Sequence, residues 1–182
     1  MVPERIHIRP AEDADLIAIT SIYGHHVQFG TASFETDSPT LDEMRERRAQ
    51  LLQQGFPYLV VEEDGRVVGY AYASAYRQRA AYRDTVQNSV YLHPDSTKKG
   101  IGSRLLATLI KTCEQAGYRQ MVAIVGDSGN IASIRLHESQ GFKLVGTLRS
   151  VGYKHGRWLD TTLLQRPLGF ADSEPPTLPQ AS

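Results

Sequence analysis

Two glycines between a strand-like segment and a helix-like segment are the feature of this sequence that most directly indicates chemistry. A β-branched and aromatic run ends at His93 and Pro94, a polar loop carries Gly100 and Gly102, and an amphipathic helical pattern follows at once. Glycines let the backbone approach a ligand closely, and the first N–H groups of a helix attract an anion, helped by the helix dipole. This order of segments favours a pyrophosphate site, and an ordinary strand–helix turn is the alternative.

Length and composition restrict the class of protein. The chain has 182 residues, of which 41% are apolar, and this suits one globular domain with a substantial core. Basic and acidic side chains number 20 each, so the net charge favours neither nucleic acid nor an anionic membrane as a partner. No apolar run approaches the length of a membrane span, and the N-terminal residues lack the apolar stretch of a signal peptide. We therefore expect a cytoplasmic protein.

Cysteine and histidine usage gives no sign of a metal site. The single Cys113 excludes an intramolecular disulfide and suits a reducing compartment, and its apolar helical surroundings favour a small core or half-buried residue over a nucleophile. His25 and His26 are consecutive, so on a helix they point to different faces and make a poor pair of metal ligands. We expect no metal.

Apolar periodicity and turn residues predict the elements that position the glycine loop. Helices are expected to begin at Pro10, Thr40, Ile101 and Asn130, and residues 31–36 are expected to be extended. Strands are expected at residues 5–9, 58–62, 67–76, 85–93, 121–125, 143–151 and 158–168. Residues 5–168 should form one domain. Residues 170–182 are too poor in apolar side chains to pack, so we expect a disordered tail.

The order of these elements resembles the GNAT acyltransferases. Their motif Arg/Gln-x-x-Gly-x-Gly/Ala corresponds to the six residues from Thr97 to Gly102, with a departure at Thr97. The segment from Asn130 to Phe142, with Leu136-His137-Glu138 inside it, also resembles the family. The resemblance implies a single GNAT-like α/β (α+β) domain, in which a mixed, mostly antiparallel sheet is flanked by about four helices.

Three further segments narrow the resemblance to the phosphinothricin and methionine sulfoximine N-acetyltransferases. These segments are Tyr82 to Leu92, Thr31 to Thr36, and the Gly-Tyr-Lys-His-Gly-x-Trp-x-Asp block from Gly152 to Asp160. Such enzymes move acetyl from acetyl-CoA to the α-amine of small glutamate-like or methionine-derived molecules. The resemblance also implies a homodimer and a role in resistance to herbicides or antibiotics of this kind. Polyamines and protein N-termini are the alternative acceptors.

The resemblance implies acetyl-CoA as co-substrate and assigns its contacts. The pantetheine arm would lie against Val90, Tyr91, Leu92 and Asn130, and the pyrophosphate against Lys98, Lys99, Gly100, Ile101, Gly102 and Ser103. Backbone N–H groups supply most of this binding, so the departure at Thr97 weakens the match without removing it. Tyr91 is expected to be a wall of the site rather than a catalyst.

Proton transfer is the open question of the predicted site, because an ammonium group must lose a proton before it can attack a thioester. The carboxylate base of the family corresponds to Gln87, and an amide cannot accept that proton at neutral pH. Gln87 either holds its place in a working enzyme or marks a protein that binds acyl-CoA without turnover. Glu35 could relay the proton through water or be a solvated loop acid.

His137 occupies the position at which most GNAT proteins carry a tyrosine that protonates the departing thiolate. The resemblance implies that this histidine is catalytic, and a half-buried packing residue is the alternative. Around the acceptor the resemblance places Phe34, Arg77, Gln78, Arg79, Gln87, Asn88 and Ser89. Arg77 suits the acceptor's carboxylate, because a guanidinium can bind it through two parallel N–H bonds.

Overall fold

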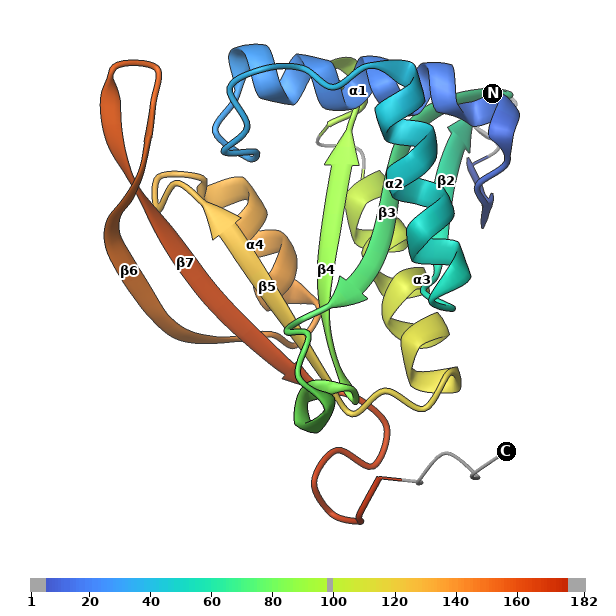
Figure 1. Cartoon of the computed structure of the whole chain (residues 1–182), viewed down its shortest axis with the longest axis vertical. Helices are drawn as coiled ribbons and strands as arrows, with labels where there is room; N and C mark the ends of the chain where they lie inside the picture. The colour runs from blue at the N-terminus through green and yellow to red at the C-terminus, as the bar shows by residue number, and fades with distance from the viewer. Residues whose placement is uncertain (1–5, 98–99, 177–182) are drawn as a thin grey trace.

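The computed structural model describes residues 6–97 and 100–176, which form one seven-stranded sheet with four α-helices (Figure 1). The strand order is β1-β2-β3-β4-β5-β7-β6, and β4 with β5 is the parallel pair among otherwise antiparallel pairings of the described strands. The strands are β1 (Ile6–Pro10), β2 (Tyr58–Glu63), β3 (Arg66–Ala75), β4 (Thr85–Leu92), β5 (Gln120–Gly126), β6 (Lys143–Lys154) and β7 (Arg157–Pro167). The helices are α1 (Leu16–Phe29), α2 (Leu41–Gln53), α3 (Ile101–Gln115) and α4 (Ile131–Ser139). The expected mixed fold is confirmed.

Helices cover both faces of the sheet, with α1 and α2 on one side and α3 and α4 on the other (Figure 1). The alternation of β2 explains this arrangement, because successive side chains of a strand point to opposite faces. Tyr58 and Val60 pack in the cluster under α1, whereas Leu59 and Val61 pack against α3. All four are buried, so β2 is apolar on both faces.

The amphipathic helix α3 fills the larger core. Leu105, Leu106, Leu109 and Cys113 are fully buried against the sheet, as the 3.6-residue repeat predicts. Burial raises the pKa of the Cys113 thiol to about 12, so this group stays a neutral core residue. The expected core position of Cys113 is therefore confirmed.

The two central strands separate along their length, and this gap positions the site. β4 pairs with β5 only from Thr85 to Asn88, although β4 continues to Leu92 and β5 continues to Gly126. Beyond Asn88, β4 stays paired with β3 and β5 stays paired with β7. The facing edges of β4 and β5 are thus left without strand partners, and ligands can use them.

Several local expectations are wrong. Pro10 ends β1 rather than opening a helix, since α1 begins at Leu16 after a short 3-10 turn. Residues 31–36 form bends and an irregular loop, whose backbone is held by side chains rather than by a neighbouring strand. Ile17 on α1 and Leu52 on α2 continue the apolar repeats that predict these helices, yet they are 72% and 42% exposed.

The described part of the segment after Gly169 contacts Arg119, and the expected disorder of the tail stays a prediction. Residues 170–174 form turns, and Arg119 donates to the carbonyl oxygens of Ala171 (3.4 Å) and Pro175 (3.3 Å) while lying over the Phe170 ring. Polar contacts to one arginine therefore hold a segment that has little apolar surface of its own. Residues 177–182 lie outside the described residues.

Candidate active site

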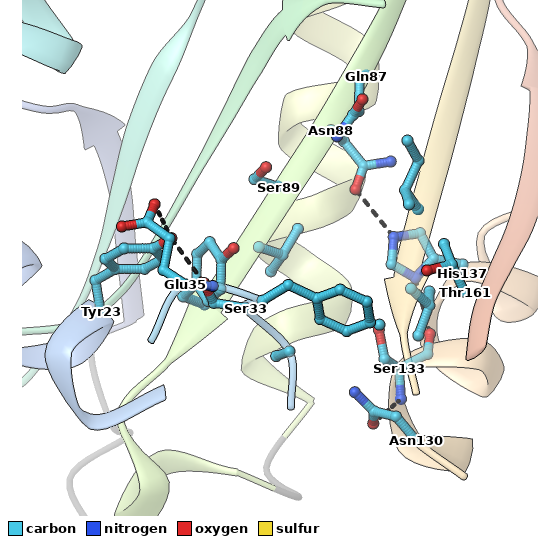
Figure 2. Close-up of a pocket in the computed structure, with 17 residues that line it drawn as sticks. Tyr23, Ser33, Glu35, Gln87, Asn88, Ser89, Asn130, Ser133, His137 and Thr161 are labelled. Atoms are coloured by element: carbon cyan, nitrogen blue, oxygen red, sulfur yellow. Dashed lines mark hydrogen bonds between the residues drawn. The ribbon is translucent and has the colours of Figure 1, made fainter. Parts of the chain in front are cut away.

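A cavity of about 460 Å³ occupies the gap between β4 and β5. Its walls come from α1, the loop at residues 32–35, β4, β5, α4 and β7. Figure 2 shows His137 and Asn88 facing each other at one end, while Tyr23, Ser33 and Glu35 gather at the other. The separation of two central strands therefore brings together residues that are far apart in the sequence.

His137 is held by acceptors on both sides of its ring. It projects from α4, is 5% exposed, and packs edge-on against Phe142. Its Nδ1 lies 2.8 Å from the Ser133 carbonyl oxygen, so Nδ1 carries a proton and donates it. Its Nε2 lies 3.0 Å from Oδ1 of Asn88 and borders the cavity. The ring is thereby fixed with Nδ1 toward the Ser133 carbonyl and Nε2 toward Asn88.

Asn88 can form a hydrogen bond with Nε2 of this histidine whether or not Nε2 carries a proton. It is 5% exposed and is the last residue of β4 that pairs with β5. With its Nδ2 donating to the Val122 carbonyl oxygen (3.4 Å), Oδ1 accepts from a protonated Nε2. A half-turn of the same amide presents N–H to an unprotonated Nε2.

Burial sets the direction of the His137 pKa. Desolvation lowers the pKa because a charged ring is costly away from water, and the hydrogen bond to the Ser133 carbonyl raises it by a smaller amount. The balance leaves the pKa below its ordinary value. A neutral imidazole that carries its proton on Nδ1 has a lone pair on Nε2, on the side of Asn88, and this lone pair can accept a proton at pH 7.

Glu35 lines the cavity but is held in an ion pair. Its carboxylate accepts two hydrogen bonds from Arg47, at 2.7 Å and 3.2 Å, and one from the Tyr23 hydroxyl at 2.8 Å. Burial raises its pKa, but the bonds from Arg47 and Tyr23 outweigh this and leave the pKa below the usual value. A carboxylate so stabilised is a weak base, so this geometry favours an anchoring role for the loop.

Gln87 lies on the cavity wall, next to Asn88 in the sequence (Figure 2). It is half-buried, and its side chain makes no hydrogen bond with the described part of the chain. Its amide is therefore available to a bound molecule, as an acceptor through oxygen or a donor through nitrogen. Ser89 and Val90 continue the same wall.

The start of α3 has the backbone that an anion site needs. Gly100 precedes the helix with φ 74°, a left-handed conformation that favours glycine, and a Cβ there would point into open space. The N–H groups of Ile101, Gly102 and Ser103 have no carbonyl partner within the helix. A Cβ on Gly102 would lie 3.2 Å from Leu92, so this turn packs closely against the end of β4.

Only some of the other residues predicted to contact acetyl-CoA lie at the cavity. Tyr91 lines the cavity as a wall, and Asn130 lines it while its side chain caps α4 by accepting from the Ser133 N–H at 3.3 Å. The Leu92 carbonyl oxygen already accepts a hydrogen bond from His26 at 2.8 Å. Lys98 and Lys99 lie outside the described residues.

The predicted acceptor contacts divide into two groups. Phe34, Gln87, Asn88 and Ser89 line the cavity. Arg77, Gln78 and Arg79 are exposed and do not line it. The Arg77 guanidinium instead lies over two rings of its own loop, 5.3 Å from the centre of Tyr76 and 5.9 Å from that of Tyr82.

Sequence reasoning missed several lining residues. Tyr23, Thr161 and Gly126 reach the cavity from α1, β7 and β5. Tyr23 lies in a helical apolar repeat, so its sequence context does not distinguish it from a tyrosine of the core. Its hydroxyl also forms a hydrogen bond with Ser33 at 2.8 Å.

Among the described residues, no cluster of His, Cys, Asp or Glu could hold a metal ion, and no helix could cross a membrane.

Known proteins match this chain over nearly its whole described length. A family model described as an acetyltransferase (GNAT) domain matches residues 8–163. A phosphinothricin N-acetyltransferase from Alcaligenes faecalis is 54% identical over 173 residues, which are 95% of this chain and 86% of that protein. An L-methionine sulfoximine/L-methionine sulfone acetyltransferase from Salmonella typhimurium is 45% identical over 162 residues, covering 87% of this chain and 92% of that protein.

A solved structure matches the fold in detail. It is the crystal structure of a GNAT superfamily phosphinothricin acetyltransferase from Sinorhizobium meliloti in complex with acetyl-CoA. The two chains are 45% identical and superpose with a TM-score of 0.92, which covers 94% of this chain and 93% of that one.

Proposed function

The chain belongs to the GNAT acetyltransferase family, and we propose that it transfers acetyl from acetyl-CoA to the α-amine of a small amino-acid analogue. Relatives named for phosphinothricin, methionine sulfoximine and methionine sulfone support this class of acceptor. The observation that carries the proposal is the cavity between β4 and β5. It borders the buried pair His137 and Asn88 at one end and the loop at residues 32–35 at the other.

The backbone at the start of α3 fits a pyrophosphate. The first N–H groups after Gly100 have no carbonyl partner within the helix, and the helix dipole adds to their attraction for an anion. The pantetheine arm would then run along the edge of β4 near Val90, which β5 leaves without a strand partner. This route brings a thioester into the cavity beside His137.

In the proposed reaction the amine nitrogen attacks the thioester carbonyl carbon, a C–N bond forms and the C–S bond breaks. The acceptor's ammonium group loses two protons in all, of which one ends on the departing CoA thiolate and one is released. Neutral His137 can accept the first proton through water and return it to the thiolate. Gln87 orients the amine through its free amide, and Glu35 anchors the loop instead of acting as the base.

Correct placement of the two substrates contributes much of the expected rate acceleration. Holding two reactants in a near-attack geometry can lower a barrier by roughly 7–11 kcal/mol. A site of this kind therefore tolerates Gln87 where a carboxylate is usual. The competing function, an acyl-CoA-binding protein without turnover, is favoured only by that one substitution.

Arg77 is proposed to bind the acceptor's carboxylate after its side chain leaves Tyr76 and Tyr82. The side chain is exposed, and this movement breaks its two ring contacts and its hydrogen bond with the Tyr76 side chain. Among the residues that the structure describes, no lysine or arginine lines the cavity. A carboxylate at its mouth therefore needs a cation from outside the wall, and a cationic polyamine would be repelled by Arg77.

We propose a homodimer in which the outer surface of β6 is covered. Leu144, Leu148 and Tyr153 on β6, with Trp158 on β7, are each more than 50% exposed. Exposed apolar surface on an edge strand is typical of an interface. Sedimentation should give a dimer, which Leu148→Asp converts to a monomer.

A cytoplasmic location and a role in resistance belong to the same proposed function. The free Cys113 supports the location, and the acceptors for which the relatives are named support the role.

Release of free CoA thiol tests the proposed function. The assay uses acetyl-CoA with phosphinothricin, methionine sulfoximine, methionine sulfone and a polyamine as separate acceptors. Thiol release that depends on the first three supports the proposal. Tight binding of acetyl-CoA without acceptor-dependent release would establish the binding protein instead.

A further inference from the structure

The loop that contains Phe34 is fastened on both sides of this residue. Ser33 is 5% exposed, its hydroxyl pairs with Tyr23, and its carbonyl oxygen accepts a hydrogen bond from the buried ammonium group of Lys154 at 2.6 Å. On the other side, Glu35 is held by its ion pair and by its N–H, which donates to the Ser33 hydroxyl at 3.2 Å. The backbone of Phe34 therefore has little freedom to retreat.

The Phe34 ring occupies a slot between a glycine of β6 and a glycine of β5. A Cβ added at Gly152 would lie 2.3 Å from Cε2 and 2.5 Å from Cδ2 of the ring. On the opposite edge, a Cβ added at Gly126 would lie 2.7 Å from Cε1 and 3.2 Å from Cδ1. The ring fits only because neither glycine has a side chain, and a shift away from one glycine brings it against the other.

An irregular stretch of β6 positions Gly152 beside the Phe34 ring. The pairing with β7 shifts between Leu148 and Gly152, and Ser150 adopts φ 52° with its N–H bonded to Asp160 at 2.9 Å. Two residues beyond Gly152, Lys154 reaches the Ser33 carbonyl. One strand thus supplies both the slot for the ring and the hydrogen bond that holds its loop.

We propose that Gly152, which lies outside the set of residues lining the cavity, determines the shape of the acceptor end of the active site by seating the Phe34 ring. This inference rests on the proposed function, because Phe34 is taken to face the acceptor. Any side chain at position 152 displaces the ring from this slot. Because the loop is held at Ser33 and Glu35, the ring, which is 37% exposed, must turn about its own side-chain bonds and so changes the wall of the cavity that it lines. The start of α3 and the edge of β4 are unaffected, so acetyl-CoA binding is preserved.

The test is a double-mutant cycle between Gly152→Ala and Phe34→Ala, with steady-state kinetics for phosphinothricin and acetyl-CoA. Gly152→Ala should lower kcat/KM for the acceptor by about tenfold or more, while KM for acetyl-CoA stays within about twofold. In the Phe34→Ala background, where no ring remains to be displaced, Gly152→Ala should change kcat/KM by less than about twofold.

Gly146→Ala is the matched control. Gly146 lies on the same strand, a Cβ there meets nothing within 4 Å, and neither glycine has the left-handed backbone that alanine resists. This variant should keep the parent kinetics. An unchanged acceptor kcat/KM in Gly152→Ala, or the same loss with and without the Phe34 ring, would overturn the inference.

Thermal unfolding separates this inference from the proposed function. Gly152→Ala should lower Tm by at least about 2 °C when Phe34 is present and by much less when it is absent. A wild-type chain that is inactive with every acceptor contradicts the proposed function and the acceptor role of Phe34 with it. An active wild-type chain in which the two substitutions are additive contradicts only the role of Gly152.

Discussion

Nε2 of His137 on α4 lies 3.0 Å from Oδ1 of Asn88 on β4, and this contact borders the gap where β4 and β5 separate. The last paired residue of the parallel strands is therefore also the residue that holds the imidazole. Because the opposite nitrogen is committed to the Ser133 carbonyl, proton exchange with a substrate must pass through Nε2. Asn88, assigned to the acceptor by resemblance, is in this geometry first a partner of His137.

Replacing Asn88 by aspartate should move the pH profile. A carboxylate beside the ring favours the imidazolium form and raises the pKa of His137 by about 1–3 units. If the neutral ring accepts the proton, the acidic limb of kcat/KM shifts to higher pH by that amount. Rates measured between about pH 5 and 9 for Asn88→Asp, with His137→Ala/Asn88→Asp as the control, show the shift. An acidic limb at the parent position would mean that His137 does not titrate in this step.

Replacing Gly100 by alanine should impair acetyl-CoA binding beyond the backbone strain alone. The control is Gly65→Ala in the β2–β3 turn, where φ is also positive at 78° and a Cβ likewise meets nothing within 4 Å. Acetyl-CoA at a hundred times its Kd should stabilise the parent by about 2.7 kcal/mol. Thermal melts should show this stabilisation in Gly65→Ala and a much smaller one in Gly100→Ala. Equal stabilisation in both variants contradicts a pyrophosphate site at α3.

Replacing Arg77 by alanine should weaken acceptor binding alone. A hydrogen bond to a charged group contributes about 1.5–3 kcal/mol, so KM for phosphinothricin should rise by about 10- to 150-fold. The residue is exposed, so stability and KM for acetyl-CoA should stay near the parent values. If both KM values rise together, Arg77 supports the fold of its loop and does not bind the acceptor.

Replacing Gln87 by glutamate should restore a proton acceptor on the cavity wall, whereas alanine removes only orientation. We expect Gln87→Glu to raise kcat/KM at low pH, where the neutral amine is scarce, and Gln87→Ala to lower it less than loss of His137 does. Steady-state rates at about pH 6 and 8 compare them. A slower Gln87→Glu enzyme at both pH values would show that the amide has a role that a carboxylate cannot fill.

Periodicity and turn residues predicted most of the fold because the decisive signals are local. The 3.6-residue repeat of α3, the short apolar run of β2 and the glycines at the start of α3 each depend on a few consecutive residues. The pairing of Glu35 with Arg47 and Tyr23 was not predictable, because it joins an irregular loop to two helices. Pro10 was misread because a proline at the end of an edge strand looks like the start of a helix.

The site was predictable only in part for the same reason. His137, Asn88 and Gln87 lie on elements with strong patterns, and the structure brings them to one cavity. Gly126 and Gly152 fall just after the strands expected at residues 121–125 and 143–151, and no local pattern singles them out. The ring that needs their space comes from Phe34, more than ninety positions earlier in the chain. Such a requirement is visible only when the strands and the loop are seen together.

The most direct test of proton transfer by His137 measures both products, acetylated acceptor and free CoA, for the parent enzyme and for His137→Ala. With acetyl-CoA and phosphinothricin, the parent should yield N-acetylated acceptor and free CoA in equal amounts, measured by mass spectrometry and thiol titration. His137→Ala, with acetyl-CoA binding intact, should turn over about 10²–10⁴-fold more slowly, as expected for loss of one acid–base group. Near-parent turnover in His137→Ala, or CoA released without acetylated amine, would contradict the account.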